Sequence, residues 1–335
     1  MSGPSPPGNG VDEFDLIARL LRPLTNGAPE ALGLLDDAAI LPGPDGTDLV
    51  VSADMIVRGV HFLPEDPMDL VARKLLRVNL SDLAAKGADP YAYFLTVAWP
   101  SDCGWTEREA FAAGLRRDQD AYGLVLLGGD TTSTPGPLTL SATVLGKVAS
   151  GAAVLRSGAA LGDVVLVSGA IGDGWLGLKA AKGEDLGLGD EAAANMAERY
   201  RLPQPRNVLA ALLRQGASAA ADVSDGLVAD AGRIAIASGV AIELDLASVP
   251  LSPEGLRYIS AQPDPASARL ALATGGDDYE LVLTVRKAQA GDLITSAAHL
   301  GVAMTRVGRV VEGEGVRVLW AGEQIRVDHA GYRHR

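Results

Sequence analysis

Apolar residues recur at helix-like and strand-like spacings along the first half of the chain. Spacings of three and four residues predict helices, whereas short apolar runs bounded by Gly, Pro or Asp predict strands. The predicted helices span residues 12–21, 69–86 and 107–122. The predicted strands span residues 38–41, 49–52, 93–98, 124–127 and 139–146. The preceding residues 1–11 are rich in Gly, Pro and Ser, which predicts a flexible tail.

The second half repeats this mixture after a Gly-rich stretch near residues 148–162. The predicted helices span residues 176–181, 191–200, 207–215 and 225–238. The predicted strands span residues 164–168, 219–223, 242–246, 280–285 and 316–320. We therefore expect an α+β protein with an N-terminal domain over residues 12–150 and a C-terminal α+β domain over residues 151–335.

Composition and charge narrow the classes of function. A chain of 335 residues is long enough for roughly two domains, and 47% hydrophobic with 21% charged residues is typical of a globular protein. The 42 acidic residues outnumber the 29 basic ones, and the net charge of −13 argues against a nonspecific nucleic-acid binder. No apolar run approaches the roughly 18 residues of a membrane span. Cys103 is the only cysteine, which excludes an intrachain disulfide and favours a cytoplasmic location.

Aspartates follow apolar runs repeatedly. The positions are Asp36 and Asp37, Asp54, Asp130, Asp222 and Asp225, and Asp277 and Asp278. Strand ends often face a shared cleft, and carboxylates gathered there repel one another unless cations lie between them. Oxygen ligands without His or Cys select Mg²⁺, Mn²⁺ or Ca²⁺. Asp is also an ordinary turn former, so one such position is uninformative, but the repetition beside paired glycines favours a metal site.

Asp82 is the most informative single acid. It lies 11 residues after Val71 and continues the apolar stripe of Leu75 and Val78 on the predicted helix. A buried carboxylate near a helix C-terminus is costly, so a partner cation is expected. That cation could be a metal or a Lys or Arg side chain, and the helix alone does not decide between them. Asn79, three residues earlier, could support the site.

Nucleotide-binding loops give a negative result. The chain has no G-x-x-x-x-G-K-[S/T] loop, and the one G-x-G-x-x-G, residues 172–177, lacks the second strand that a dinucleotide site requires. Arg156 could clamp a phosphate or be a solvated loop cation. His61, between Val60 and Phe62, is more typical of a packed or capping residue than of a catalyst.

Several short segments, taken in order, resemble the thiamine-monophosphate kinase family. They are LDDAA at 35–39, SADM at 52–55, GVHF at 59–62, NLSDLAAKGA at 79–88, GGDTT at 128–132, RSGA at 156–159, DVSDGL at 222–227 and GGDDYEL at 275–281. Each is weak alone, but together they are specific, and the resemblance extends over residues 12–332. One departure is Asp277, which stands where the family usually has Glu.

This resemblance implies a fold, a reaction and a set of partners. The fold is the two-domain aminoimidazole ribonucleotide synthetase-like fold, whose N-terminal domain binds metal and ATP and whose strands form a barrel across a homodimer. The reaction converts ATP and thiamine monophosphate into ADP and thiamine diphosphate, the last step of thiamine diphosphate biosynthesis, with several Mg²⁺ ions. We expect direct in-line phosphoryl transfer without a covalent or general-base residue, because a phosphate acceptor with a second pKa of about 6 is already ionised near neutral pH.

The resemblance also implies site residues. The expected metal ligands are Asp37, Ser52, Asp54, Asp82, Asp130, Asp222 and Asp225. The expected ATP contacts are Gly129, Asp130, Arg156 and Ser224, and the expected substrate contacts are His61, Asp277 and Tyr332. Two alternatives remain open: another ATP-using enzyme of the same superfamily, and a non-catalytic protein that binds thiamine phosphate or metal.

Overall fold

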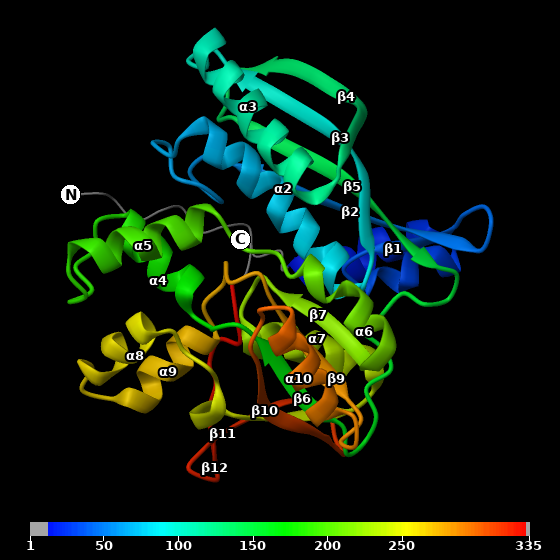
Figure 1. Ribbon diagram of the computed structural model, residues 1–335, viewed down its shortest axis with the longest axis vertical. Helices are drawn as coiled ribbons and strands as arrows, with labels where there is room; N and C mark the ends of the chain where they lie inside the picture. Colours follow the sequence, from blue (N-terminus) through cyan, green and yellow to red (C-terminus); the bar gives the residue numbers. More distant parts are fainter. Residues whose placement is uncertain (1–12, 333–335) are drawn as a thin grey trace.

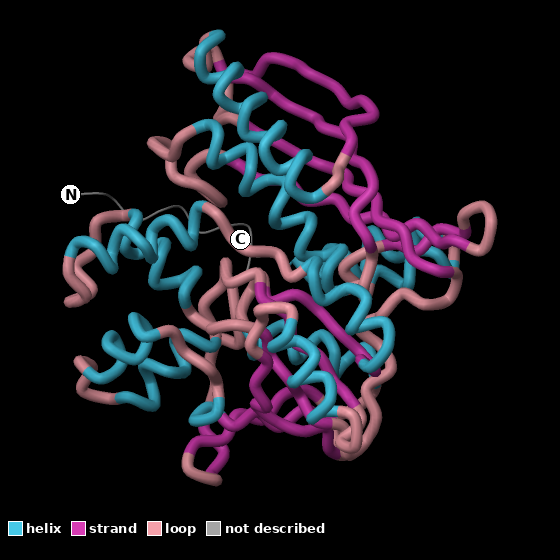
Figure 2. The backbone as a smooth tube through the Cα atoms, viewed as in Figure 1, coloured by secondary structure: helices cyan, strands magenta, loops and turns pink. Residues whose placement is uncertain are grey.

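Two separate β-sheets, each covered by helices, make up the structure (Figure 1), a computed structural model that describes residues 13–332. Strands before residue 150 form one sheet and strands after residue 163 form the other. Neither sheet closes on itself within the described residues. Loop segments gather between the two sheets (Figure 2). The predicted tail, residues 1–11, lies outside the described part of the chain.

The N-terminal sheet has five strands in the order β1-β2-β5-β3-β4. Their bounds are β1 Ala39–Pro42, β2 Thr47–Val57, β3 Asp89–Pro100, β4 Val125–Thr134 and β5 Thr139–Ala149. Neighbouring strands run antiparallel except β3 and β4, which are parallel. Burial alternates along β2 and β5, as expected for strands with one face on a core.

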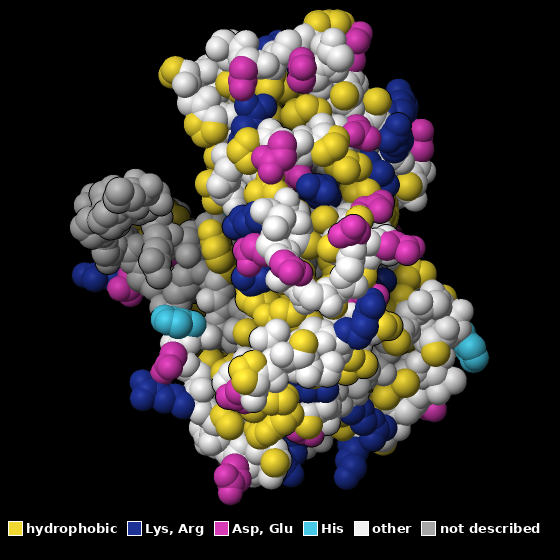
Figure 3. All heavy atoms as spheres, turned by 90° about the vertical axis from the view of Figure 1, so that its left-hand side faces the viewer, with side chains coloured by type: hydrophobic (Ala, Val, Ile, Leu, Met, Phe, Trp, Pro, Cys, Tyr) yellow, Lys and Arg dark blue, Asp and Glu magenta, His cyan; other side chains and the backbone are white. Residues whose placement is uncertain are grey.

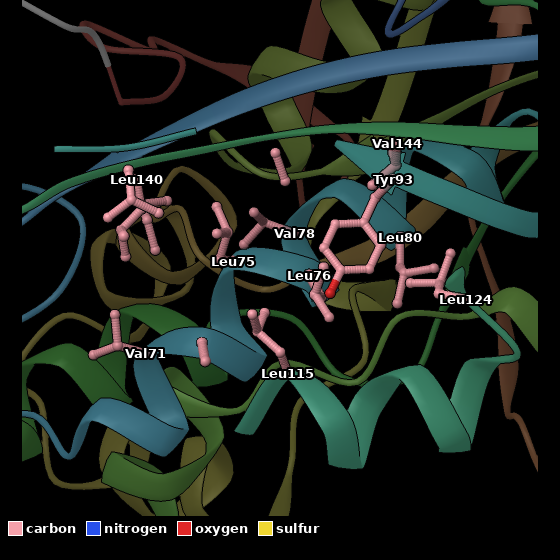
Figure 4. Close-up of a cluster of buried hydrophobic side chains, with 14 of the residues drawn as sticks. Val71, Leu75, Leu76, Val78, Leu80, Tyr93, Leu115, Leu124, Leu140 and Val144 are labelled. Atoms are coloured by element: carbon pink, nitrogen blue, oxygen red, sulfur yellow. The ribbon is translucent and has the colours of Figure 1, made fainter. Parts of the chain in front are cut away.

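Two long helices cover this sheet, namely α2 (Met68–Ala85) and α3 (Trp105–Tyr122). Helix α2 lies between the sheet and α3, so almost all of its side chains are buried. Figure 4 shows Leu75 and Val78 of α2 facing Leu140 and Val144 of β5, with Leu115 of α3 on the opposite side. Before the sheet, α1 (Glu13–Leu16) continues as a π-helical turn, Ile17–Leu21, and then as 3₁₀ turns, Arg22–Thr25 and Pro29–Leu34.

The C-terminal sheet has seven strands in the order β12-β11-β8-β10-β6-β9-β7. Their bounds are β6 Val164–Ser168, β7 Ala217–Val223, β8 Ala241–Asp245, β9 Glu280–Val285, β10 Met304–Val311, β11 Gly315–Trp320 and β12 Glu323–Ile325. Only β8 and β11 pair in parallel. The helices of this half are α4 Asp173–Ala181, α5 Asp190–Arg201, α6 Ala210–Gly216, α7 Leu227–Ser238, α8 Pro253–Ser260, α9 Pro265–Ala273 and α10 Ala290–His299. Short 3₁₀ turns at Asn207–Leu209 and Leu246–Ser248 complete it.

The C-terminal end of α2 connects the two halves. Ala84 and Ala85 pack in one apolar cluster with Leu166, Ala220 and Leu281 of the second sheet. Because Asp82 lies one turn earlier, this packing brings its carboxylate next to the end of β7.

The pattern of apolar positions predicted most of the helices and strands, but some bounds differ from the prediction and some elements were missed. The strand predicted at residues 49–52 extends over all of β2, so Asp54 lies within a strand and not after it. Asp130 likewise lies within β4. The helix predicted from residue 225 begins at Leu227, because Gly226 has a φ of 122° and ends the preceding turn. Helices α8, α9 and α10 and strands β10 and β12 were not predicted.

The surface carries charged residues of both signs, as the mixed charge of the sequence suggests (Figure 3). Acidic and basic side chains are interspersed on the face shown in Figure 3. No helix among residues 13–332 is long and apolar enough to cross a membrane.

Candidate active site

A cavity of about 760 Å³ is lined by residues of both halves of the chain. Eleven of the residues predicted for the site line it, and they are Asp37, Ser52, Asp54, His61, Asp82, Arg156, Asp222, Ser224, Asp225, Asp277 and Tyr332. A cavity of this size is typical of small-molecule sites. The structure therefore brings together residues up to 295 positions apart in sequence, Asp37 to Tyr332.

Three buried carboxylates form the centre of this cavity wall. Asp37, Asp82 and Asp222 each offer an oxygen, and these oxygens all lie within 4.8 Å of one another. Asp37 precedes β1, Asp82 is on α2 and Asp222 is near the end of β7. Ser52 of β2 donates a hydrogen bond of 2.5 Å to Asp82 Oδ2. Asp54, two residues further along β2, adds a fourth carboxylate beside them.

Asp54, Asp82 and Asp222 have raised pKa values, and few positive charges of the protein lie near them. Burial, and next the charge of Asp54, raises the pKa of Asp82 well above its usual value. Burial, and next the charge of Asp37, raises the pKa of Asp222 well above its usual value and that of Asp54 to about 6. No Lys or Arg among the described residues forms an ion pair with Asp54, Asp82 or Asp222. The salt-bridge alternative for Asp82 is therefore not found in the described part of the chain.

Asp37 differs because two cations contact it. Arg156 Nη2 pairs with its Oδ1, and Lys86 Nζ lies 2.7 Å from its Oδ2. Burial raises the pKa of Asp37, but Arg156 and Lys86 outweigh it and hold the pKa below its usual value. Lys86 also lies 2.5 Å from Asp36 Oδ1 and is fully buried. Arg156 is thus a partnered residue of the cavity wall and not a solvated loop cation.

The oxygen-only cluster fits a hard divalent cation. Carboxylate and hydroxyl oxygens converge from four segments. Burial first, and then mutual repulsion, raises the pKa values of Asp54, Asp82 and Asp222, and a bound cation would offset both effects. Asp37 Oδ2 is buried, and the Lys86 ammonium at 2.7 Å uses one of its two lone pairs, which leaves the other for such an ion. Asn79 supports this arrangement, since its side-chain oxygen accepts a hydrogen bond of 3.1 Å from the backbone N–H of Asp54.

His61 is oriented by the backbone of its own loop. The N–H of Val57 donates a hydrogen bond of 3.0 Å to His61 Nδ1. A neutral imidazole whose Nδ1 accepts carries its proton on Nε2, so the ring presents Nε2 as a donor. The sequence offered no signal for this partner, because Val57 has no polar side chain.

The two substrate residues expected in the C-terminal half come from one loop and from the last described residues of the chain. Asp277, in the loop before β9, has a φ of 70°, a left-handed conformation that is uncommon for a residue other than Gly. Its N–H donates to the carbonyl of Ser224, so the two loops are tied together. Tyr332 is half-exposed, and its N–H donates to the carbonyl of Asp225.

Two predicted residues lie elsewhere. Gly129 and Asp130 are exposed on β4 and do not line the cavity of their own chain. Gly129 is required there for a steric reason: its φ is 148°, and a Cβ would lie 1.7 Å from the carbonyl oxygen of Leu95 on the neighbouring β3. The structure therefore explains this glycine by close strand packing.

The G-x-G-x-x-G segment has a structural explanation as well. The carboxylate of Asp278 accepts hydrogen bonds from the backbone N–H groups of Gly172 and Gly174, at 2.8 and 2.9 Å. A Cβ on Gly174 would lie 2.2 Å from the carbonyl oxygen of Asp277. These glycines let the start of α4 pack against the loop before β9.

Sequence reasoning missed several residues that the cavity wall contains or depends on. Arg22, Trp175 and Arg233 line the cavity, and Lys86 lies behind Asp37. Arg233 forms ion pairs with Asp225 and with Asp230. Lys86 is defined by acids distant in sequence, whereas the acids of Arg233 lie three and eight residues away, a local signal that could have identified this arginine.

Comparison with known proteins places the chain in a class. Residues 35–148 match the N-terminal domain, and residues 160–321 the C-terminal domain, of AIR synthase related proteins. The fold is therefore that of this class of two-domain proteins with mixed α and β content.

Closer relatives identify the family. Thiamine-monophosphate kinase of Caulobacter vibrioides is 52% identical over 322 residues, covering 96% of this chain and 90% of the relative. The Escherichia coli K12 protein of the same name is 39% identical over 327 residues, covering 96% and 98%. The chain belongs to the thiamine-monophosphate kinase family.

Solved structures agree with this assignment. A structure described as AaThiL complexed with AMPPCP and TMP matches with a TM-score of 0.83 at 30% identity, over 97% of each chain. Thiamine-monophosphate kinase from Stenotrophomonas maltophilia K279a matches with a TM-score of 0.76 at 39% identity, over 93% of this chain and 98% of that one. The expected two-domain aminoimidazole ribonucleotide synthetase-like fold is thereby confirmed.

Proposed function

We propose that this protein transfers the γ-phosphoryl group of ATP to thiamine monophosphate, giving ADP and thiamine diphosphate. The observation that carries the proposal is the set of carboxylates with raised pKa values on a cavity wall that both halves of the chain build. Two phosphate groups must meet during this reaction, and both are anionic. A wall of uncompensated acids can accept two such groups only when cations lie between them.

We propose that several Mg²⁺ ions supply this positive charge. Asp37, Ser52, Asp54, Asp82, Asp222 and Asp225 would hold them in the cavity, together with Asp130. When bound, Mg²⁺ neutralises phosphate oxygens and helps to align donor and acceptor. Arg156, already directed at Asp37, and Ser224 would contact ATP, as would Gly129 and Asp130.

We propose that His61, Asp277 and Tyr332 contact thiamine monophosphate. The Nε2 donor of His61 suits a phosphate oxygen, because the Val57 N–H occupies the other ring nitrogen. The same tautomer argues against a phosphohistidine, since neither nitrogen then has a free lone pair for attack on phosphorus. The acceptor phosphate is itself a competent nucleophile, so direct in-line transfer needs no covalent step.

We also propose that the protein works as a homodimer in which strands of two N-terminal sheets form a barrel. Strand β4 is an edge strand, and its residues Val125, Leu126 and Leu127 are exposed by 54%, 44% and 51%. Exposed apolar edges are usually covered by another element. Because Gly129 and Asp130 lie on this same strand, outside the cavity of their own chain, the proposal places them at the cavity of the partner copy. Domain bounds at residues 12–150 and 151–335 and a cytoplasmic location remain predictions.

The test is turnover of thiamine monophosphate with MgATP, followed by separation of the thiamine phosphates. Formation of thiamine diphosphate with equal amounts of ADP is expected. Binding of thiamine monophosphate without turnover would support the non-catalytic alternative. ADP formation that requires a different acceptor would support another enzyme of the superfamily.

A further inference from the structure

One lysine is buried behind two of the expected substrate residues. Lys74 of α2 is 2% exposed, and its ammonium group donates a hydrogen bond of 3.0 Å to the carbonyl oxygen of His61. The same ammonium lies 3.4 Å from Asp277 Oδ1 and 3.6 Å from the centre of the Tyr200 ring. No motif in the sequence singles out this residue.

A buried ammonium group is costly unless its charge is compensated. Among the described residues, Asp277 is the only carboxylate that forms an ion pair with Lys74. The face of the Tyr200 ring adds a cation–π contact on another side. Burial lowers the pKa of Lys74, and the charge of Asp277 opposes this effect and favours the ammonium form.

The ion pair fixes a carboxylate that also belongs to the cavity wall. The Asp277 side chain is 29% exposed and lines the cavity, so it connects the buried lysine to the space where a ligand binds. Asp277 has a left-handed backbone conformation, which persists only where surrounding contacts hold it. Those contacts are the hydrogen bond from its N–H to the carbonyl of Ser224, the ion pair to Lys74, and a long hydrogen bond, of 3.5 Å, from the Tyr279 hydroxyl to its Oδ1.

The same lysine joins segments from both halves of the molecule. Lys74 and His61 come from the first half, whereas Asp277 and Tyr200 come from the second. The hydroxyl of Tyr200 donates a second hydrogen bond, of 3.1 Å, to the carbonyl of His61. The Lys74 ammonium group and the Tyr200 phenol therefore fix the position of the His61 loop relative to the Asp277 loop.

We propose that Lys74 is a positioning residue for the acceptor substrate: it sets the orientation of the Asp277 carboxylate and the distance between the Asp277 and His61 loops. This inference rests on the proposed function, because it takes thiamine monophosphate as the ligand of these loops. Loss of the lysine removes the ion pair and leaves the Asp277 carboxylate with only the long hydrogen bond from the Tyr279 hydroxyl, which weakens acceptor binding and leaves the ATP contacts in place.

The experiment measures steady-state kinetics of Lys74→Met, Lys74→Arg, Asp277→Asn and the double variant Lys74→Met/Asp277→Asn. In Lys74→Met the KM for thiamine monophosphate should rise roughly tenfold or more, whereas kcat and the KM for ATP should stay within about twofold. Lys74→Arg keeps the charge and should recover part of the loss. Since much of the effect of Lys74 passes through Asp277, the loss in the double variant should be smaller than the product of the two single losses.

Lys147→Met is the matched control. Lys147 lies 3.4 Å above the Tyr91 ring, so it has the same kind of cation–π contact, but it is exposed on β5 and does not line the cavity. This variant should have wild-type kinetics. If Lys74→Met fails to fold, the double variant still decides, because it removes both charges of the ion pair together.

The outcomes separate the two proposals. Equal losses in the KM values for both substrates, or a double variant whose loss is the product of the two single losses, would overturn the positioning role. A wild-type protein that does not phosphorylate thiamine monophosphate would overturn the proposed function instead. A wild-type protein that is active, with Lys74→Met indistinguishable from it, would overturn only the inference on Lys74.

Discussion

Two groups of residues at the same cavity differ in whether the protein supplies a positive charge beside their carboxylates. The acid cluster, defined as Asp54, Asp82 and Asp222, has no ion-pair partner among the described residues, and burial with mutual repulsion raises the pKa of each acid. The acceptor wall, defined as His61 and Asp277 with Lys74 and Tyr200 behind them, has its one carboxylate paired with a buried ammonium. The first group lacks cationic charge, and the second is balanced by the protein itself.

This difference separates chemistry from positioning. A cluster that is unfavourable without cations has to take them from solution, and cations between phosphates act on the transfer step itself. A wall whose charges are already balanced gains nothing from metal, so its contribution is the geometry of a bound acceptor. Substitutions in the acid cluster should therefore lower kcat, and substitutions in the acceptor wall should raise KM.

The largest expected effect is the loss of the acid cluster. Asp82→Asn and Asp54→Asn should each lower kcat by at least about two orders of magnitude, because each removes one of the charged oxygens that we propose as metal ligands. Excess chelator should likewise abolish turnover in the wild type, and added Mg²⁺ should restore it. Full activity in chelator would contradict the role assigned to the cluster.

Asp82→Asn, which should lower kcat, should nevertheless raise the stability of the metal-free protein. Asp82→Asn removes a carboxylate that its neighbours repel, so the melting temperature of the metal-free protein should rise. Asp118→Asn is the matched control, because Asp118 is equally buried but is paired with Arg73 and Arg77. That variant leaves two arginines without their acid and should lose about 3 kcal/mol of unfolding free energy. Stability changes of the same sign in the two variants would contradict the distinction between acids that lack a cationic partner and acids that have one.

A mixing experiment tests whether the acid cluster is completed by a second chain. Asp130→Asn and Asp82→Asn should each be nearly inactive alone. If Asp130 acts at the partner's cavity, each mixed dimer contains one intact site, so subunit exchange should restore about a quarter of wild-type activity. No recovery after confirmed exchange, or a stable monomer in light scattering at micromolar concentration, would contradict the dimeric site.

The stabilisation by Mg²⁺ should depend on pH. The unfolded chain ionises its aspartates near pH 4, whereas the pKa of Asp54 in the folded protein is about 6 and those of Asp82 and Asp222 are also raised. As pH rises from about 4 to 6, the unfolded state releases protons that the folded state keeps, so these groups make the metal-free protein less stable. Bound Mg²⁺ requires the ionised acids, so its shift in melting temperature should be larger at pH 8 than at pH 5. Equal shifts at both pH values would contradict the assignment of these acids as ligands.

The sequence predicted the acid cluster better than the acceptor wall. Asp82 is visible from sequence because it continues an apolar stripe, and α2 buries it as that stripe predicts. The cations of the site are not visible, because their acids lie far away: Lys86 is 50 residues from Asp36, and Arg156 is 119 residues from Asp37. Lys74 and Asp277 are brought together only when the two halves pack.

The limits on strand and helix prediction have a similar cause. The pattern predicted a short strand at residues 49–52, but β2 continues through Asp54 because it pairs with β5 along its whole length, and Asn79 of α2 accepts a hydrogen bond from the Asp54 backbone N–H. A tertiary contact thus keeps a polar position within a strand. The position of Gly129 within β4 depends in the same way on close contact with Leu95 of β3, which local propensity does not contain.

The smallest expected effect on chemistry belongs to His61 of the acceptor wall. With Nδ1 accepting from Val57, the ring offers only the Nε2 donor, so His61→Asn removes a hydrogen bond to the acceptor and no step of the transfer. The KM for thiamine monophosphate should rise several-fold while kcat changes by less than about threefold. Incubation of the wild-type protein with γ-labelled ATP and Mg²⁺, without acceptor, should leave no label on the chain. Label bound to His61 that then passes to thiamine monophosphate would mean that the imidazole attacks phosphorus, and the acceptor wall would then take part in chemistry as the acid cluster does.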